Sequence, residues 1–329
     1  MKVLSFLMLL TFCSIHSNVR ALDYFHYQKL VNSLDDKIIE SKYEETISTL
    51  DSIYNNFNFV YARHCVKALQ ICLRVRDEER SALWLNKAVL AGVPQWYLKQ
   101  LTSLRAIHYI PSCKLILKQY DSLHQIYLKR INRKLADYID SLYDIDQFRT
   151  KRVNDGFAPL RISIYGLQWI NNNKRQWKLL QQVMTTYGFP GEQLLGLPKM
   201  FEDTSVMFKN NVYRFNQLDA YQTYIMLIHC YSRKTKSIND LLYRAVKLGQ
   251  MPAYQYAAIN DFMAEYGYKA YSRNYFNQWH TTKDSTMFND IMIRRREIGL
   301  NTLEQKHKNE QVSAGRRKAK TYYEEVFLE

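Results

Sequence analysis

Apolar residues recur every three or four positions along most of this chain. In the first third of the sequence they form three separate stripes, at 43–54, 62–73 and 82–92. This spacing is that of one face of an α-helix. Asn55 and Asn56 separate the first two stripes, and Gly92 followed by Pro94 ends the third in the order typical of a helix C-terminus. We therefore predict three amphipathic helices joined by short turns.

In the second half the stripes lengthen. Apolar residues keep helical spacing from Ile116 to Leu142, and no glycine or proline interrupts them before Gly156, which predicts one long helix, straight or bent, that joins the two halves. Another helix is predicted to begin at Asn173, a good N-cap residue, and to end at Gly188. Further helices are predicted at 212–232, 237–248, 253–266 and 285–296.

Glycine and proline are scarce, with 10 and 6 among 329 residues, and their densest group predicts a structured loop at 188–212. So few turn residues argue against a turn-rich β-sandwich or barrel, and the alternation typical of strands is almost absent. With 47% apolar and 14% aromatic residues, the chain can bury a substantial core, which argues against wholesale disorder. The fold class that we predict is all-α.

Small residues lie on the apolar stripes of the first half, among them Ala62, Ala68, Ala82 and Ala88. Helical hairpins of this kind resemble tetratricopeptide-type or Sel1-type repeats, although no strict period runs through more than about two units. We therefore expect repeat-like helical hairpins followed by a second helical domain. The expected organisation is a leader at 1–21, a repeat-like domain at 22–110, a helical domain of unknown function at 111–300, and a basic C-terminal helix or tail at 301–329.

The leader has the features of a cleavable secretory signal peptide. Lys2 precedes an apolar run from Val3 to Ile15, and the segment ends at Ala21, the small residue that signal peptidase requires. A membrane anchor or a buried helix is the weaker interpretation, because the run is too short to span about 30 Å of hydrocarbon. We therefore expect an exported protein without a transmembrane span in the mature chain.

A lipoprotein is the less favoured form of this export signal. The segment from Leu10 to Cys13 resembles a lipobox, in which Cys13 would become the acylated N-terminus. Phe12 stands where a small residue is needed, which argues against acylation. The expected location is the periplasm or the extracellular space.

The chain is strongly basic, with a formal charge of +15 that falls to +13 when Lys2 and Arg20 leave with the leader. Inside a cell this charge, together with 26 tyrosines for stacking, would favour nucleic acid. Because we expect the protein to be exported, we do not expect nucleic acid as its partner. An unknown protein, or an anionic ligand or surface in the cell envelope, is favoured instead. A general lysine-rich bias without any partner stays open as the alternative.

The cysteines do not indicate a disulfide scaffold or a metal site. Cys65, Cys72, Cys113 and Cys230 remain after the leader is removed, and they are few and widely spread. Cys65 and Cys72 are seven residues apart on one predicted helix, so their Cα atoms lie about 10.5 Å apart, beyond bridging distance. Zinc-finger, HExxH and EF-hand spacings are absent from the sequence, and no Gly-rich phosphate loop is present, so we expect no metal and no cofactor.

Several short motifs follow one another in the second half. They are Asp146-Gln147-Phe148-Arg149, Tyr187-Gly188-Phe189-Pro190-Gly191 with Gly196 further on, His229 after an apolar run, Asp261, and Arg294-Arg295-Arg296 before Gly299. Their order and spacing over about residues 110–300 resemble a bacterial family of domains of unknown function. Members of that family carry D-Q-x-x-R, Gly-aromatic-Pro-Gly, Gln-His, Asp-Arg and Tyr-Gly-Thr-Gln-like segments. The resemblance implies a site made of Asp146, Gln147, Arg149, His229 and Asp261.

The chain also departs from the family pattern. Ile228 stands where the family has Gln before His229, and Phe262 stands where it has Arg after Asp261. The segment 271–274 replaces most of the Gly-Thr-Gln. Polar groups are lost at each of these positions, so any family chemistry is expected to be altered or absent in this chain.

The residues themselves allow two interpretations. Asp146 and Arg149 lie three positions apart on one helix face, either as an exposed ion pair or in a cleft where Arg149 holds an anionic group. His229 lies on a largely apolar helix, where a histidine is more often a core residue than a catalyst. As a catalyst it would act as a general acid or base, oriented by Asp146 or Asp261. No nucleophile-elbow motif supports a Ser-His-Asp triad.

The arginine run at 294–296 also has two interpretations. The run lies in the last turn of a predicted helix that Gly299 caps, where positive charge complements the helix dipole. The alternative is a site for a phosphate or a lipid headgroup. We favour the structural role.

Two functions therefore stay open for the whole chain. The first is an interaction module that presents a concave, basic helical surface to a protein or ligand. The alternative is a hydrolase-like enzyme that uses His229 with Asp146, Arg149 and Asp261. Catalysis requires these four residues to converge in one pocket. We further predict that Asp146, Gln147 and Arg149 face inward against the helix that carries His229.

Overall fold

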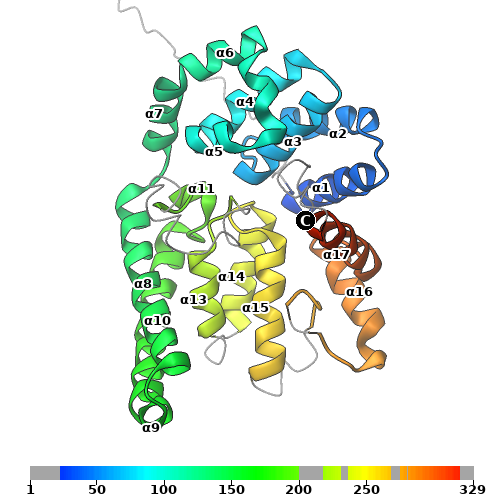
Figure 1. Cartoon of the computed structure of the whole chain (residues 1–329). Helices are drawn as coiled ribbons and strands as arrows, with labels where there is room; N and C mark the ends of the chain where they lie inside the picture. The colour runs from blue at the N-terminus through cyan, green and yellow to red at the C-terminus, as the bar shows by residue number, and fades with distance from the viewer. Residues whose placement is uncertain (1–22, 200–217, 231–235, 268–274, 280, 319–329) are drawn as a thin grey trace, which may run out of the picture.

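A computed structural model of the chain describes residues 23–199, 218–230, 236–267, 275–279 and 281–318 (Figure 1). This part of the chain contains sixteen α-helices and no strand, which confirms the all-α prediction. The expected leader at 1–21, the substituted segment at 271–274 and the last eleven residues of the predicted basic tail, 319–329, lie outside the described residues.

The N-terminal helices form one layer, drawn in blue and cyan in Figure 1. Buried side chains from several of them, such as Leu50, Leu69 and Trp84, share a single apolar core. Asp77 caps the fourth helix, because its carboxylate accepts a hydrogen bond from the backbone N–H of Arg80 at 2.9 Å. The helices of this layer are α1 (Tyr24–Ile39), α2 (Ile47–Asn56), α3 (Ala62–Arg74), α4 (Glu78–Leu90) and α5 (Gln95–Gln100).

The single long helix predicted from Ile116 to Leu142 is wrong. The chain instead forms α6 (Pro111–Lys118), α7 (Tyr120–Arg130) and α8 (Arg133–Asp155). The first break places Tyr120 so that its hydroxyl donates to the carbonyl of Val93 at 3.1 Å. At the second break, Asn132 caps α8, and its backbone N–H donates to the carbonyl of Leu194 at 2.8 Å. Tertiary hydrogen bonds thus interrupt a periodic pattern that contains no helix breaker.

The N-terminal core extends beyond the domain boundary predicted near residue 110. Cys113 and Tyr120 belong to it, and α6 and α7 pack against α4. The division into a repeat-like domain and a second helical domain therefore stays a prediction.

The remaining helices build a second core below the first layer. Ile139, Leu180, Met226, Leu242 and Ile259 lie in its centre. The last two helices of the chain pack beside it and below α1 (Figure 1). These elements are α9 (Ala158–Leu160), a π-helical turn (Arg161–Tyr165), α10 (Gly166–Tyr187), α11 (Glu192–Leu195), α13 (Gln222–His229), α14 (Lys236–Lys247), α15 (Ala253–Tyr266), α16 (Phe288–Glu297) and α17 (Leu303–Lys318).

Two helix boundaries show how well local signals predict the ends. Helix α15 coincides with its predicted range, because Pro252 precedes it and Gly267 follows it. Helix α10 begins at Gly166, so the prediction that Asn173 caps it is wrong. Asn173 lies inside the helix, where its side-chain amide donates to the carbonyl of His229 at 3.1 Å.

Buried polar contacts join the two cores. The Glu192 carboxylate, at the start of α11, accepts a hydrogen bond from the first backbone N–H of α3, that of Ala62, at 2.6 Å. The Tyr61 hydroxyl donates to the carbonyl of Gly249 at 2.9 Å. At the far end of the chain, Asn32 of α1 donates to the carbonyl of Gly299 at 2.7 Å. Hydrogen bonds therefore join the N-terminal layer to the second half of the chain at Glu192, Gly249 and Gly299.

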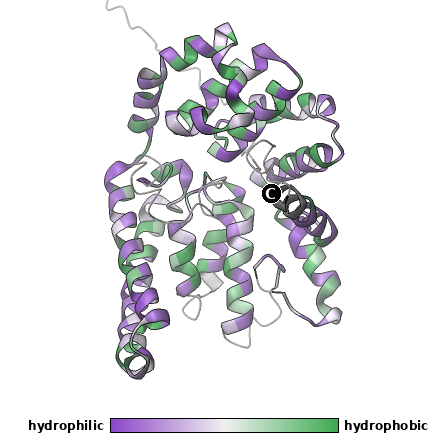
Figure 2. Ribbon diagram, viewed as in Figure 1, coloured by the Kyte–Doolittle hydropathy of each residue, from purple (hydrophilic) through white to green (hydrophobic). Residues whose placement is uncertain are grey.

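The described helices are amphipathic rather than uniformly apolar, as the alternation of green and purple along them shows (Figure 2). None of them is both long and apolar enough to cross a membrane. The cysteines at 65, 72, 113 and 230 are buried, and none of them forms a disulfide within the described structure.

Candidate functional site

Asp146 and His229 form a hydrogen-bonded pair between α8 and α13. His229 Nδ1 lies 2.7 Å from Asp146 Oδ2. The Asp146 side chain is wholly buried, whereas that of His229 is 20% exposed. A carboxylate can only accept a hydrogen bond, so Nδ1 carries the proton in this contact and Nε2 of a neutral ring is left as the acceptor. The pair therefore has the geometry of an oriented histidine that reaches the surface.

Neighbouring side chains hold this pair in place. The Gln147 side-chain amide donates to Asp146 Oδ2 at 3.0 Å. The Trp169 ring lies edge-on to the His229 ring, with 5.8 Å between centroids. Asp146 Oδ1 is buried and accepts no hydrogen bond from the described residues. A buried carboxylate oxygen without a hydrogen-bond donor costs free energy. The contacts of the neighbouring side chains must therefore offset this cost and hold Asp146 in place.

Sequence reasoning missed Asn173 and Trp169 as members of this cluster. Asn173, Gln176 and Leu180 lie on the buried face of α10, three to four residues apart. The Gln176 amide donates to the carbonyl of Leu142 at 2.6 Å, which fixes α10 against α8. The sequence signal for a buried polar cluster was the presence of polar residues on an otherwise apolar stripe. We instead interpreted Asn173 as a helix cap.

The predicted inward placement holds for Asp146, while Gln147 is only half-buried. For Arg149 the prediction is wrong. Its guanidinium donates to Gln168 Oε1 at 2.6 Å, in an exposed contact between α8 and α10. It also lies near the exposed Phe148 ring, 5.8 Å from its centroid.

Asp261 lies in a different cluster, on α15. Its carboxylate accepts hydrogen bonds from the backbone N–H groups of Phe276, Gln278 and Trp279 at 2.6–2.7 Å. Burial raises the pKa of Asp261, while these three hydrogen bonds and the charge of Arg295 oppose that rise. The carboxylate thus anchors the chain before α16. In the described structure it makes no hydrogen bond to Asp146 or His229.

The arginine run at 294–296 lies in the last turn of α16, the position predicted for it, and two of its side chains bind main-chain carbonyls. Arg295 is 1% exposed, and its guanidinium donates to the carbonyls of Phe276 and Asn301, each at 2.6 Å. Burial lowers the pKa of Arg295 to about 10. Arg294 donates to the carbonyl of Tyr275 at 3.0 Å. Main-chain carbonyls therefore occupy donors of Arg294 and Arg295, while Arg296 is exposed.

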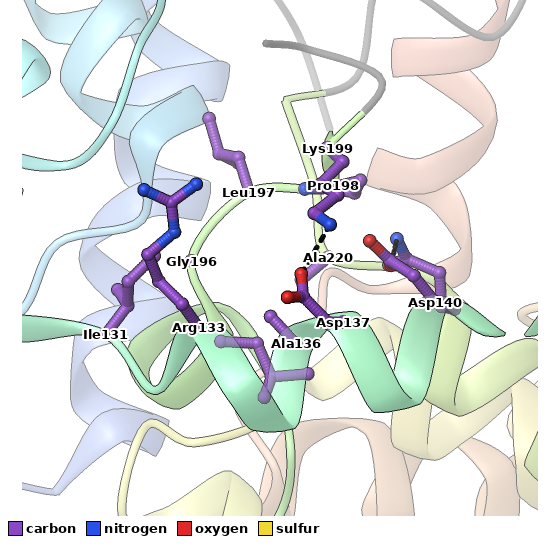
Figure 3. A pocket seen from close by; sticks show the side chains of 12 residues that line it. Ile131, Arg133, Ala136, Asp137, Asp140, Gly196, Leu197, Pro198, Lys199 and Ala220 are labelled. Carbon is purple, nitrogen blue, oxygen red and sulfur yellow. Dashed lines mark hydrogen bonds and ion pairs between the residues drawn. The ribbon is translucent and has the colours of Figure 1, made fainter. Parts of the chain in front are cut away.

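A small polar pocket lies between the start of α8 and the segment after α11 (Figure 3). Two of the side chains that line it form an ion pair, in which Lys199 Nζ lies 2.5 Å from Asp137 Oδ1. Asp140 accepts a hydrogen bond from the Gln222 amide at 2.9 Å, and burial raises the pKa of Asp140 to about 6. The cavity volume is only about 20 Å³, which is room for about one water molecule.

A larger cavity of about 350 Å³ lies between the α4–α5 turn and α7. Its walls are mostly aromatic and apolar, and none of the described residues that line it is an aspartate, glutamate, lysine or arginine. It is lined by Gly92, Pro94, Gln95, Trp96, Tyr120, His124, Tyr127, Leu128 and Leu197. We call it the aromatic pocket.

Ring stacking fixes the back wall of the aromatic pocket. The His124 ring stacks on the Tyr120 ring at 15°, with 5.4 Å between centroids, and lies 5.3 Å from the Tyr127 ring. Tyr127 is buried, and its hydroxyl accepts a hydrogen bond from the backbone N–H of Leu197 at 2.8 Å. A Cβ added at Gly92 would lie 2.3 Å from the Tyr127 ring, so the tight turn after α4 requires glycine.

Within the described ranges, no group of three or more His, Cys, Asp or Glu side chains could hold a metal ion. The buried thiols are also poor metal ligands here, because burial raises the pKa of Cys72 to about 12 and that of Cys113 to about 11.

No family model, curated protein or solved structure matches this chain. The resemblances to helical repeats and to the bacterial family of unknown function therefore stay predictions.

Proposed function

We propose that the protein is an exported interaction module of the cell envelope, and that it takes an apolar or aromatic group of its partner into the aromatic pocket. The observation that carries this proposal is the cavity itself. Its volume of about 350 Å³ is within the usual range of ligand sites, and Trp96, Tyr120 and Tyr127 supply rigid apolar walls.

The lining of the pocket sets the chemistry of the bound group. Among the described residues that line it, the polar groups are the side chains of Gln95 and His124, the tyrosine hydroxyls and the indole N–H of Trp96. A charged group inside would lose its hydration without gaining a counter-ion, so a neutral ring or aliphatic side chain fits best. Arg130 lies outside the lining, with its guanidinium 5.8 Å from the centroid of the Tyr127 ring. Together with the net positive charge of the chain, it favours a partner with acidic residues around the apolar group.

The residues that an enzyme would need are separated in this fold. Asp146 and His229 form a pair, but Arg149 contacts Gln168 at the surface and Asp261 anchors a loop on another helix. No hydroxyl or thiol among the described residues hydrogen-bonds to His229 in the position of a nucleophile. The separation favours the interaction module over the hydrolase.

A site-specific crosslinking experiment tests the proposal. The photoreactive residue p-benzoylphenylalanine replaces Leu128, which lines the pocket, and in a control it replaces Leu83, which is 41% exposed on α4. We expect irradiation of the producing cells to yield a discrete crosslinked partner from position 128 and none from position 83. The same bands from both positions, or none from 128, would contradict the proposal.

The alternative is a hydrolase-like enzyme, and one observation favours it: Asp146 orients His229, whose ring is partly exposed. In that case Nε2 acts as a general base toward water or a substrate hydroxyl. Turnover of a panel of esters and amides should then fall at least about 100-fold in His229→Ala and much less in Arg149→Ala. Absence of turnover by the unmodified protein would remove this alternative.

A further inference from the structure

The hairpin formed by α8, α9 and α10 exposes an unusual amount of apolar surface. Its closed end lies beyond the ends of α13 and α15 in Figure 1. Six large apolar side chains between 145 and 170 are 43–68% exposed, and the most exposed of them, Phe157, lies in the turn itself. They are Ile145, Phe148, Phe157, Ile164, Leu167 and Ile170. We call this segment, residues 145–170, the hairpin tip.

Basic side chains lie among these apolar ones. The hairpin tip carries Arg149, Lys151, Arg152 and Arg161, and its acids are Asp155 and the buried Asp146. Lys151 is exposed and the three arginines are half-buried, so the surface of the tip is apolar with positive charge within it. This combination is typical of segments that bind at the interface of an anionic membrane.

Contacts across the tip join its two helices into one surface. The guanidinium of Arg152 lies over the rings of Phe148 and Tyr165, at 5.7 Å and 4.2 Å from their centroids. A Cβ at Gly156 would lie 2.7 Å from the Tyr165 ring, so the chain turns directly against that ring. The apolar and basic side chains are thus held together around the turn rather than spread over the helices.

The backbone of the turn is already hydrogen-bonded. The Gly156 N–H donates to the carbonyl of Arg152 at 3.1 Å, and the Leu160 N–H donates to that of Phe157 at 2.9 Å. The Gly156 carbonyl accepts a hydrogen bond from Arg161 Nε at 2.5 Å. These groups do not need water as a partner, so the turn can enter the acyl boundary of a bilayer without leaving them unsatisfied.

We propose that the hairpin tip docks the protein on the surface of an anionic lipid bilayer. Phe157 and its apolar neighbours enter the headgroup region, and Lys151 and Arg152 bind the lipid phosphates. A projecting, positively charged tip is a poor match for a second copy of itself, because like charges repel. A deformable bilayer accepts a convex apolar tip without a preformed pocket. The proposal does not depend on the aromatic pocket.

Cosedimentation with lipid vesicles tests this docking. The full-length protein is mixed with vesicles of phosphatidylcholine alone and with vesicles that contain about one third phosphatidylglycerol. We expect binding to the anionic vesicles that exceeds binding to the neutral ones at least about tenfold, and that weakens strongly between 0.1 and 0.5 M salt. Equal binding to both compositions, or no binding, would overturn the proposal.

Matched variants locate the binding surface. The apolar variant Phe157→Ser/Ile164→Ser/Leu167→Ser and the charge variant Lys151→Gln/Arg152→Gln should each lose at least about tenfold in binding. Their controls replace equally exposed residues on and beside α6 and α7, and should change binding less than about twofold. The controls are Tyr109→Ser/Leu115→Ser/Ile126→Ser and Lys114→Gln/Lys118→Gln. Equal losses in variants and controls would overturn the proposal.

A fluorescent label at position 157 reports insertion directly. Cysteines 65, 72, 113 and 230 are buried, so an NBD dye attached to Phe157→Cys in a Cys13→Ser background labels selectively. We expect a blue shift and a rise in NBD emission when anionic vesicles are added, and no change for a label at Leu115→Cys. The absence of a spectral shift at position 157 would contradict bilayer docking. A larger oligomer that disappears in the apolar variant would also contradict it, and would indicate a protein partner.

Discussion

The surroundings of Asp146 and Asp261 differ, although the sequence suggested one site for both. Asp261 accepts hydrogen bonds from three backbone N–H groups and lies near the buried charge of Arg295. Asp146 receives only Gln147 and His229, both on one oxygen, and its other oxygen has no donor among the described residues. One carboxylate is a structural anchor, and the other orients a histidine that reaches the surface.

The comparison shows what separates a structural carboxylate from one that is available for function. A carboxylate bonded to the backbone fixes the path of the chain and cannot be replaced without breaking that path. A carboxylate bonded to side chains can lose a partner while the backbone stays in place.

The largest effect is expected at Asp261. Asp261→Ala leaves one buried and two part-buried backbone N–H groups without an acceptor, and it removes the negative charge that most favours the charged form of Arg295. We therefore expect a loss of about 3–5 kcal/mol in the free energy of unfolding. Asp290→Ala, at an exposed position on α16, is the control and should change stability by less than about 0.5 kcal/mol. Urea unfolding followed by circular dichroism measures both. A loss at Asp261 as small as at Asp290 would show that the loop is held by other contacts.

A large pH effect is expected from Glu192. Burial raises its pKa from 4.5 to about 8, against the hydrogen bond from Ala62 and the charges of Arg63 and Arg130, and Asp219 adds to the rise. The unfolded chain releases this proton near pH 4.5 and the folded chain near pH 8, so stability falls as the pH rises between these values. Between pH 5 and 8 the loss is roughly 3 kcal/mol.

The variant Glu192→Gln isolates this contribution. Its side-chain carbonyl can still accept the hydrogen bond from Ala62, but it has no proton to release. We expect the unfolding free energy of the variant to fall between pH 5 and 8 by roughly 3 kcal/mol less than that of the unmodified protein. Urea unfolding at the two pH values measures the difference. Parallel pH profiles would contradict the assignment to Glu192.

A smaller effect is expected at His229. His229→Ala removes one of the two donors to Asp146 and leaves its buried carboxylate with Gln147 alone, so we expect a loss of about 2 kcal/mol. A double-mutant cycle with Asp146→Asn should give a coupling of about 1–2 kcal/mol, because the two side chains interact directly. Independent effects would mean that the hydrogen bond contributes little to the fold.

The smallest effect is expected at Arg149. An inward arginine would have cost more than about 2 kcal/mol on removal, but this side chain makes an exposed contact with Gln168. Arg149→Ala should therefore change the unfolding free energy by less than about 0.5 kcal/mol. A loss above about 2 kcal/mol in urea unfolding would restore the inward placement that the sequence suggested.

Local signals predicted the helical fold well where they were strong. Helix α15 begins after Pro252 and ends before Gly267, and α3 matches the stripe at 62–73 to within a residue. The break at Gln119 had no such signal, and the break at Ile131 had only Asn132, the N-cap residue of α8. They are set by hydrogen bonds to Val93 and Leu194, which are distant in sequence, so periodicity alone could not locate them.

The candidate site was predicted in part. The inward placement of Asp146 was predicted correctly, because this residue lies beside the apolar stripe of α8. The structural role of Asp261 was not predicted. Its hydrogen-bond donors are backbone N–H groups, which nearly every residue type carries, so the sequence does not mark them. The aromatic pocket was also missed, since a tyrosine that lines a cavity and one that fills a core have the same spacing on a helix.

Copurification of the partner tests the central claim, that the aromatic pocket and not the histidine pair is the interaction site. Tagged protein is purified from the producing cells as the unmodified chain, as Trp96→Ala, as His124→Ala and as His229→Asn, each after a thermal melt confirms folding. The account predicts that the first two variants lose at least about tenfold of the copurified partner and that His229→Asn retains it. Loss of the partner in His229→Asn, with full retention in both pocket variants, would contradict it.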